Sequence, residues 1–283
     1  MATPREINRH MKSVGNIGKI TKAMKMVAAA RLRRAQEKAA ASRPYAIKIK
    51  EVLSNVVSDP SVLAGLDAKK HPLLQKREVQ KVGYLVLCSD KGLAGAYSSN
   101  ALKMAVAEIS ECEDEVVVIT CGRKARDFFT RRGFNVIQSH IGFSDRPTYE
   151  NAVDIAQDAI KTFASEGFDK LNIVYTVFKT ALSQIPTSEV ILPVEPPVKE
   201  EGKAQASFMF EPGEDDTLTV LAPKYLETVV YAALVQSAAS ELGSRMTAMS
   251  SATDNAAKLV SSLQLSYNKA RQAGITRELN EIV

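Results

Sequence analysis

The sequence predicts an α/β protein in which long N- and C-terminal helices form an antiparallel coiled coil beside a Rossmann-like domain with a mostly parallel sheet. Two observations predict this class. Helical apolar periodicity covers both ends of the 283-residue chain, and short β-rich runs alternate with helical stretches between them. We expect an N-terminal coiled-coil helix at 1–58, a linker at 59–78, the α/β domain at 79–216 and a C-terminal coiled-coil helix at 217–283.

The N-terminal segment predicts one long helix from Ile7 to about Val57. Pro4 stands at a natural helix start. Periodicity resumes after Pro44, so we expect a kink at this proline rather than an end. The apolar residues that recur at steps of three and four are Ile7, Met11, Val14, Ile17, Ile20, Met24, Val27, Leu32, Ala35, Ala39, Ile47, Val52 and Val56.

The middle of the chain alternates strands and helices of the length that parallel crossovers need. The proline-rich stretch Val190–Phe210 predicts one or two edge strands and an exposed acidic loop. The predicted core strands are Val82–Cys88, Glu115–Cys121, Lys170–Phe178 and, more weakly, Phe134–Ser139. The predicted helices between them are Ala96–Ser110, Arg123–Arg132 and Tyr149–Glu166.

The C-terminal segment carries a repeat of 3.5 residues, which is the pattern of a left-handed coiled-coil seam. No proline follows Pro223, so about sixty residues can form one helix about 90 Å long. Many seam residues are small, which permits close approach but buries little apolar area, so part of this rod is expected to need a partner. The seam residues are Leu242, Met246, Met249, Thr253, Ala256, Val260, Leu263, Tyr267, Ala270 and Gly274.

Charge is distributed unevenly along the chain. Residues 1–50 hold 13 basic and two acidic side chains, a net +11, while the whole chain carries +5, so the other 233 residues sum to −6. Such a helix could follow nucleic-acid phosphates or lie against acidic protein surfaces. Residues 1–40 contain no aromatic side chain that could read bases, so we expect a protein partner and no nucleic acid.

No catalytic or cofactor-binding pattern is recognisable. Gly92 and Gly95 precede a predicted helix, but GxGxxG and GxxxxGK[ST] motifs are absent, so a tight turn explains them better than a phosphate site does. Three scattered histidines and three cysteines without CxxC spacing predict no metal site and a reducing compartment. The longest run without charge, Thr228–Ser240, is thirteen residues, too short to span a bilayer. We therefore expect no cofactor and no catalysis by the isolated chain.

Three motifs resemble the gamma subunit of F-type ATP synthases, in order along the chain. One is Ile20-Thr-Lys-Ala-Met-Lys-Met-Val-Ala-Ala-Ala30, and another is Ser89-Asp-Lys-Gly-Leu-Ala-Gly-Ala-Tyr97. The C-terminal motif comprises Arg245-Met-Thr-Ala-Met249, Ala252-Thr-Asp-Asn255 and Leu265-Ser-Tyr-Asn-Lys-Ala-Arg-Gln-Ala-Gly-Ile-Thr276. One departure from the family pattern is a pair of glycines, Gly15 and Gly18, which should loosen the first helix.

The resemblance implies a non-catalytic rotor that couples ion flow through a membrane ring to ATP synthesis or hydrolysis. The coiled coil would sit among the alpha and beta subunits of the catalytic head, and the α/β domain would meet the epsilon subunit and the c-ring. One copy per complex, peripheral on the cytoplasmic face of a bacterial cell membrane, is implied. The alternatives are a free-standing nucleotide-binding α/β protein with a coiled-coil arm and a nucleic-acid-binding coiled coil.

Six residues match positions that contact partners in this family. Met24 and Lys25 match the N-terminal-helix position that faces the acidic levers of the beta subunits, and Arg245 matches the C-terminal-helix contact in the same zone. The residues that match tip contacts with a loop of one beta subunit are Arg271, Gln272 and Thr276.

Overall fold

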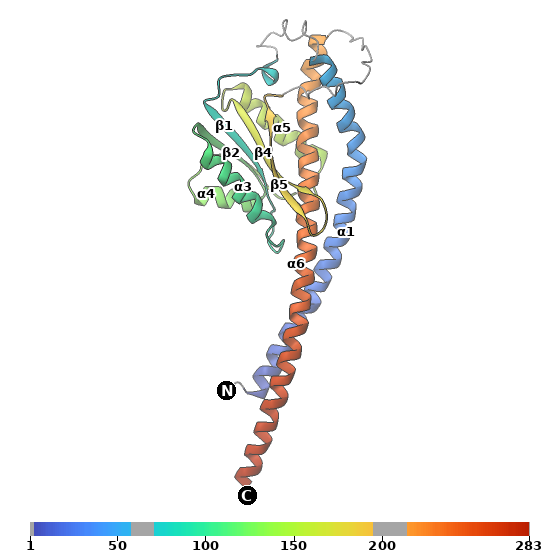
Figure 1. Ribbon diagram of the computed structural model, residues 1–283, viewed down its shortest axis with the longest axis vertical. Coiled ribbons are helices and arrows are strands. Elements are labelled where there is room, and N and C mark those ends of the chain that lie inside the picture. The colour runs from blue at the N-terminus through green and yellow to red at the C-terminus, as the bar shows by residue number, and fades with distance from the viewer. Residues whose placement is uncertain (1–2, 58–70, 195–213, 283) are drawn as a thin grey trace.

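Two long helices run antiparallel beside a smaller α/β unit in the computed structural model, which describes residues 3–57, 71–194 and 214–282. Helix α1 spans Pro4–Val57 and helix α6 spans Glu214–Ile282. We call the α/β unit, residues 71–194, the foot. Figure 1 shows the helix pair passing the foot and projecting far beyond it, with both termini at the projecting end.

The foot is built on a five-stranded sheet in the order β3-β2-β1-β4-β5. Strands β1 to β4 are parallel, and β5 pairs antiparallel with β4. This confirms the predicted Rossmann-like, mostly parallel class. The strands span Lys81–Leu87 (β1), Glu115–Cys121 (β2), Val136–His140 (β3), Lys170–Phe178 (β4) and Gln184–Leu192 (β5).

The predicted edge strand exists but lies earlier in the chain than expected. Strand β5 begins at Gln184, and only its last residues fall within the predicted Val190–Phe210. Pro186 is tolerated inside β5 because an edge strand has one side that needs no backbone donor. The acidic loop predicted after it lies outside the described residues.

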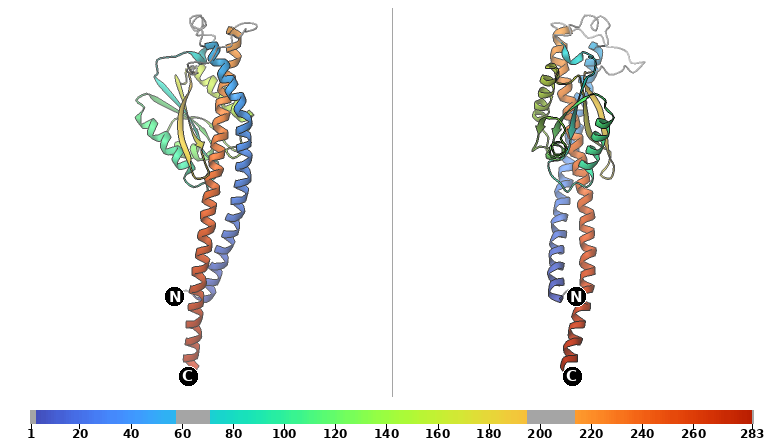
Figure 2. Two further views of the ribbon diagram at one scale, coloured as in Figure 1. Left: turned by 45° about the vertical axis from the view of Figure 1, so that its right-hand side comes forward. Right: turned by 90° about the vertical axis from the view of Figure 1, so that its left-hand side faces the viewer.

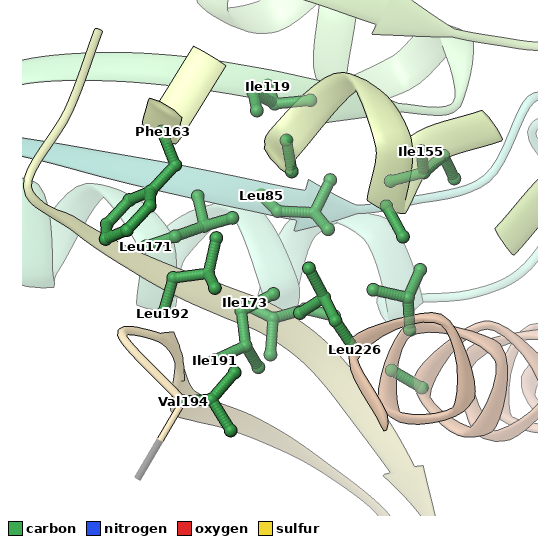
Figure 3. Packing of buried hydrophobic residues seen from close by; sticks show 14 of the residues in the cluster. Leu85, Ile119, Ile155, Phe163, Leu171, Ile173, Ile191, Leu192, Val194 and Leu226 are labelled. Atoms are coloured by element: carbon green, nitrogen blue, oxygen red, sulfur yellow. The ribbon is translucent and has the colours of Figure 1, made fainter. Parts of the chain in front are cut away.

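Helices cover both faces of the sheet, and each face has its own core. Helices α3 (Tyr97–Glu111) and α4 (Arg123–Arg131) pack on one face. Helix α5 (Tyr149–Ala164) and the upper part of α6 pack on the other, where a short 3-10 turn, η1 (Pro72–Leu74), also lies. Figure 3 shows Leu226 of α6 among side chains of β1, β4, β5 and α5. The foot is therefore fused to α6 through a continuous apolar core.

Helix α1 packs on α6 and reaches this core only near its own end, at the buried Leu53. It continues through Pro44, as the periodicity predicted, and bends around α6 (Figure 2). A window within Asp216–Thr276 is apolar enough to span a membrane by length and composition, with mean hydropathy 1.4. Half of that window is buried inside the protein, so its apolar side chains are used in packing.

Candidate functional site

The part of the helix pair that projects beyond the foot is the candidate site. We call residues 4–30 of α1 and 249–282 of α6 the rod (Figure 1). The foot reaches α1 as far as Arg31, which pairs with Asp145. It reaches α6 as far as Ala248, which lies close to Gly95. Beyond these residues the two helices contact only one another among the described residues.

The seam of the rod follows the predicted 3.5-residue repeat on α6. Every predicted seam residue from Leu242 to Gly274 is buried or half-buried. The closest approach joins small residues: Thr21 Oγ1 and Thr253 Oγ1 share a hydrogen bond of 2.8 Å. A Cβ added to Gly18 would lie 3.4 Å from the Cβ of Ala256. Small side chains thus let the helices pack closely with little buried apolar area.

On α1 the buried seam differs from the apolar pattern of the sequence. It passes through Val14, Gly18, Thr21 and Ala28, all buried or half-buried. Ile17, Ile20 and Val27 instead remain 50%, 59% and 51% exposed. The reason is that the repeat of α6 fixes which face of α1 it meets, and small residues fit the small residues opposite.

These exposed side chains form an apolar stripe on α1. Ile17, Ile20, Met24 and Val27 follow steps of three and four and therefore share one helix face. Large exposed apolar side chains continue on α6 at Leu259, Leu265, Ile275 and Leu279. Six basic and one acidic side chain lie on α1 between residues 4 and 30, and all seven are exposed. An apolar surface with basic surroundings is typical of a protein interface.

Of the predicted contact residues, Met24 lies in this stripe and Lys25 lies next to it. Met24 belongs to it and is half-buried. Lys25 is exposed, and its Nζ donates a 2.9 Å hydrogen bond to Ser250 Oγ across the seam. The sequence motif that contains them therefore lies on the rod, partly in the seam and partly on the surface.

Arg245 lies elsewhere, in the angle between α6 and the foot. Its side chain is 10% exposed, and it donates a 2.6 Å hydrogen bond to Glu241, whose side chain is 1% exposed. It also donates to the carbonyl of Gly92 at 3.4 Å. Burial raises the pKa of Glu241, and Arg245 opposes this by stabilising the carboxylate. Within this chain Arg245 is already engaged by the fold.

Arg271, Gln272 and Thr276 lie on the free end of α6, and all three are exposed. The pairing of Thr21 with Thr253 in an antiparallel helix pair places Pro4, the first residue of α1, opposite Ala270. The next twelve residues therefore extend beyond α1 for about 18 Å as a single helix. Figure 1 shows this overhang at the C-terminal end.

In the foot, α6 packs against the carboxyl end of β4, beside the crevice where a Rossmann-like fold would hold a nucleotide. The strand order reverses between β1 and β4, and ligands of such folds bind at the carboxyl ends of the strands at this point. Here Ser240 Oγ donates to the carbonyl of Thr176 at the end of β4 (2.9 Å), and the backbone N–H of Thr176 lies 3.4 Å from Ser237 Oγ.

Gly95 has a packing role at the same place. Its φ is +55°, and an added Cβ would lie 3.0 Å from Ser244 Oγ on α6. The loop after β1 therefore turns tightly to receive a helix. Cys88 and Cys121 are buried at the strand ends, and burial raises the pKa of the Cys88 thiol to about 12. Within the described ranges, no three metal-ligating side chains come together.

Comparison with known proteins decides the family. The chain matches the ATP synthase family over residues 3–283. It is 47% identical to the ATP synthase gamma chain of Brevibacillus brevis over 99% of this chain and 96% of that one. It is 43% identical to the gamma chain of Desulfitobacterium hafniense, over 100% and 98%. The chain belongs to the ATP synthase gamma-chain family.

A solved structure shares the fold of this gamma-family chain. It is the rotor of the Euglena gracilis mitochondrial ATP synthase, with a TM-score of 0.63, 17% identity, and coverage of 96% of this chain and 98% of that one. Family membership confirms the rotor function that the three motifs implied. A gamma chain is a central-stalk subunit of the synthase and is non-catalytic on its own.

Proposed function

We propose that the rod of this gamma-family chain turns inside the catalytic head formed by alpha and beta subunits, while the foot meets the epsilon subunit and the c-ring. One copy per complex would sit peripherally on the cytoplasmic face of a bacterial cell membrane. The exposed surface of the rod carries the proposal, because it is apolar and basic and no described part of the chain covers it.

The chemistry of this surface suits a rotating contact. Apolar side chains on the helix pair can be buried by the surrounding alpha and beta subunits. Such burial needs no directional bonds, which would fix the rod at one angle of rotation. The exposed basic side chains, including Lys22 and Lys25, would be attracted to acidic levers as these pass. The seam has little apolar area, so a surrounding socket would also support the rod.

We assign Met24 and Lys25 to the zone that faces the beta levers. Arg245 lies at the upper end of the same zone, and its contact with a partner carboxylate would compete with Glu241. The exposed Arg271, Gln272 and Thr276 on the overhang would bind a loop of one beta subunit. Nothing from α1 competes for them, because α1 ends near the level of Ala270.

The test is reconstitution of the full chain with alpha and beta subunits. We expect an ATPase-active complex that co-purifies as one assembly; failure to assemble would overturn the proposal. Equilibrium binding of ATP or NAD by the isolated chain, or strongly salt-dependent DNA binding, would instead support one of the two alternative functions.

A variant pair tests the lever contact. Met24→Lys adds a charge within the apolar stripe, and we expect less ion pumping per ATP hydrolysed in membrane-reconstituted synthase. Met26→Lys is the matched control, because Met26 is 59% exposed and lies on another face of the same helix. Equal coupling in the two variants would remove Met24 from the lever contact.

A further inference from the structure

The described residues at which the foot and the two helices begin or end toward one another lie at the end of the foot far from the rod. Helix α1 ends at Val57 and α6 begins at Glu214; the backbone N–H of Val194, two residues after β5, donates to the carbonyl of Leu73 in η1 (2.7 Å). The apolar core with α6 also lies in this upper half, up to Leu234. At the rod end of the foot, the helices are therefore held by non-covalent contacts from the end of β4 and from loops.

Two loops contribute to these contacts beside the end of β4. They follow β1 (residues 88–96) and β3 (residues 141–148), because parallel strands end at the same edge of a sheet. The first loop holds α6: Ser244 Oγ donates to the carbonyl of Ala94 at 2.7 Å in a buried position. The second loop holds α1 through an ion pair between Asp145 and Arg31. The first loop thus contacts α6, whereas the second contacts α1 through Asp145 and α6 through a hydrogen bond between Ser144 and Glu241.

Asp90 joins the two loops into one unit. Its carboxylate accepts hydrogen bonds from the backbone N–H groups of Gly142 (2.9 Å) and Ser144 (3.0 Å) in the second loop. It also accepts from the N–H of Arg123 at 3.1 Å, and its own N–H donates to Ser144 Oγ at 2.9 Å. Lys91 Nζ, beside Asp90, lies 3.7 Å from Asp145.

The contact of the foot with α1 includes a single ion pair within the described part of the chain. Arg31–Asp145 is the one ion pair there that joins α1 to the foot. The two side chains are 29% and 14% exposed, so the pair is screened less than one on the open surface. Near it, Leu32 of α1 also lies in an apolar cluster against which Phe178 of the foot packs.

We propose that Asp145 and Arg31 form a torsional latch that makes both helices turn with the foot where the rod leaves it. The Asp90-linked loops are the rigid part of this latch, since they hold α6 through Ser244 and α1 through Arg31. Torque between foot and rod then passes into two helices in parallel. The inference rests on the rotor function of the family and not on the partner contacts proposed above.

The experiment measures torsional stiffness in the assembled complex. The catalytic head, containing this chain, is fixed to a surface, and a probe is attached to the foot at Cys112, which among the three cysteines is the one that is not buried. The angular variance of the probe during an ATP-waiting dwell is inversely proportional to the stiffness between head and foot. Bulk ATPase activity is recorded for the same preparations.

Asp145→Asn and Arg31→Gln should each raise the angular variance, by up to about twofold if one of two parallel helices is released, while ATPase activity is retained. The double variant should be no softer than either single variant, because both remove the same interaction. Asp127→Asn is the matched control: it removes an ion pair with Arg126 that lies wholly within the foot.

Unchanged variance in both single variants, relative to Asp127→Asn, would overturn the latch. Additive softening in the double variant would also overturn it, since the two residues would then act independently. If ATPase activity fell while the variance stayed constant, Asp145 would be a partner contact and not a latch. None of these results depends on which residues of the rod face the beta subunits.

Discussion

Arg245 illustrates that a residue proposed to contact a partner can also be required by the fold. Its guanidinium is the counter-charge of Glu241, a carboxylate almost completely buried between α6 and the foot. A carboxylate left without its partner in such a place has lost both hydration and charge compensation. Loss of function in an Arg245 variant is therefore informative about partners only when stability is measured as well.

We predict that Arg245→Ala lowers the stability of the isolated chain by about 3 kcal/mol, because it leaves Glu241 charged and unpaired. Arg271→Ala is the matched control, since Arg271 is exposed on the overhang and should change stability by less than about 0.5 kcal/mol. Thermal unfolding followed by circular dichroism measures both. Equal melting temperatures would show that the Glu241–Arg245 pair contributes nothing.

Asp90 gives the loops at the rod end a pH dependence of known sign. Burial alone would raise the pKa of its carboxyl, but hydrogen bonds from the backbone N–H groups of Ser144, Gly142 and Arg123 hold that pKa below the usual 3.8. A carboxyl with a lowered folded-state pKa contributes stability above pH 3.8, and this contribution is lost as the pH falls through the folded-state value.

Asp90→Asn should therefore lower the melting temperature at pH 7, with a difference from wild type that shrinks as the pH is taken below about 4. The measurement is a series of thermal melts between pH 7 and pH 3. Asp114→Asn is the control, because Asp114 is exposed at the junction of α3 and β2. A difference that grows toward low pH would contradict the assigned role of Asp90.

The seam between α1 and α6 shows the compromise in building a long thin element. Gly18, Thr21, Thr253 and Ala256 allow close approach, yet they bury little apolar area for each turn. Gly15 adds flexibility without a packing reason, since nothing lies within 4 Å of the position its Cβ would occupy. The free rod is thus held together weakly near its end.

Gly15→Ala should stabilise this end of α1 by up to about 1 kcal/mol, because alanine restricts the unfolded chain and favours the helix. Slower amide hydrogen exchange in residues 8–20 is the expected signal. The opposite behaviour is expected of Gly122→Ala in the foot: φ there is +96°, and a Cβ would lie 2.2 Å from the carbonyl oxygen of Cys88. Faster exchange in Gly15→Ala would show that the glycine has a packing role.

The elements differ in how far the sequence could predict them. The seam of α6 was predictable because one strict 3.5-residue repeat runs through it. On α1, the series through Ile17, Ile20 and Val27 has the larger side chains, and which face is buried depends on the small residues opposite. Strand β5 contains Pro186, and a strand can contain a proline at such a position only at the edge of a sheet.

The candidate site was predictable only in part. The motifs place Met24, Lys25, Arg271, Gln272 and Thr276 on the helices that form the rod, because helix positions follow from periodicity. The burial of Arg245 against the foot could not follow from periodicity, since it depends on a loop about 150 residues earlier in the chain. The same holds for Arg31 and Asp145, which are 114 residues apart and follow no spacing rule.

Considered as one molecule, the chain separates two mechanical tasks. The foot is a cored α/β unit fused to α6, whereas the rod leaves large apolar side chains uncovered along its length. In an isolated chain these side chains contribute little to stability, because they are exposed in the folded and the unfolded state alike. Their contribution appears only when a partner removes them from water.

The apolar stripe should therefore matter for assembly and not for folding. In the double variant Ile20→Ala/Val27→Ala, we expect the melting temperature of the isolated chain to stay unchanged, because the two side chains are 59% and 51% exposed and alanine favours the helix. Burying the exposed part of Ile20 or Val27 is worth about 1 kcal/mol for each side chain, so affinity for the alpha–beta head should fall about thirtyfold.

Leu182→Ala in the foot is the matched control, since Leu182 is 89% exposed and lies in the loop between β4 and β5, outside the rod. Titration of labelled chain into alpha–beta heads measures the affinity. A double variant that binds as tightly as Leu182→Ala would mean that the stripe stays exposed to water in the assembled complex. The alpha–beta head would then have to bind the rod through its charged side chains alone.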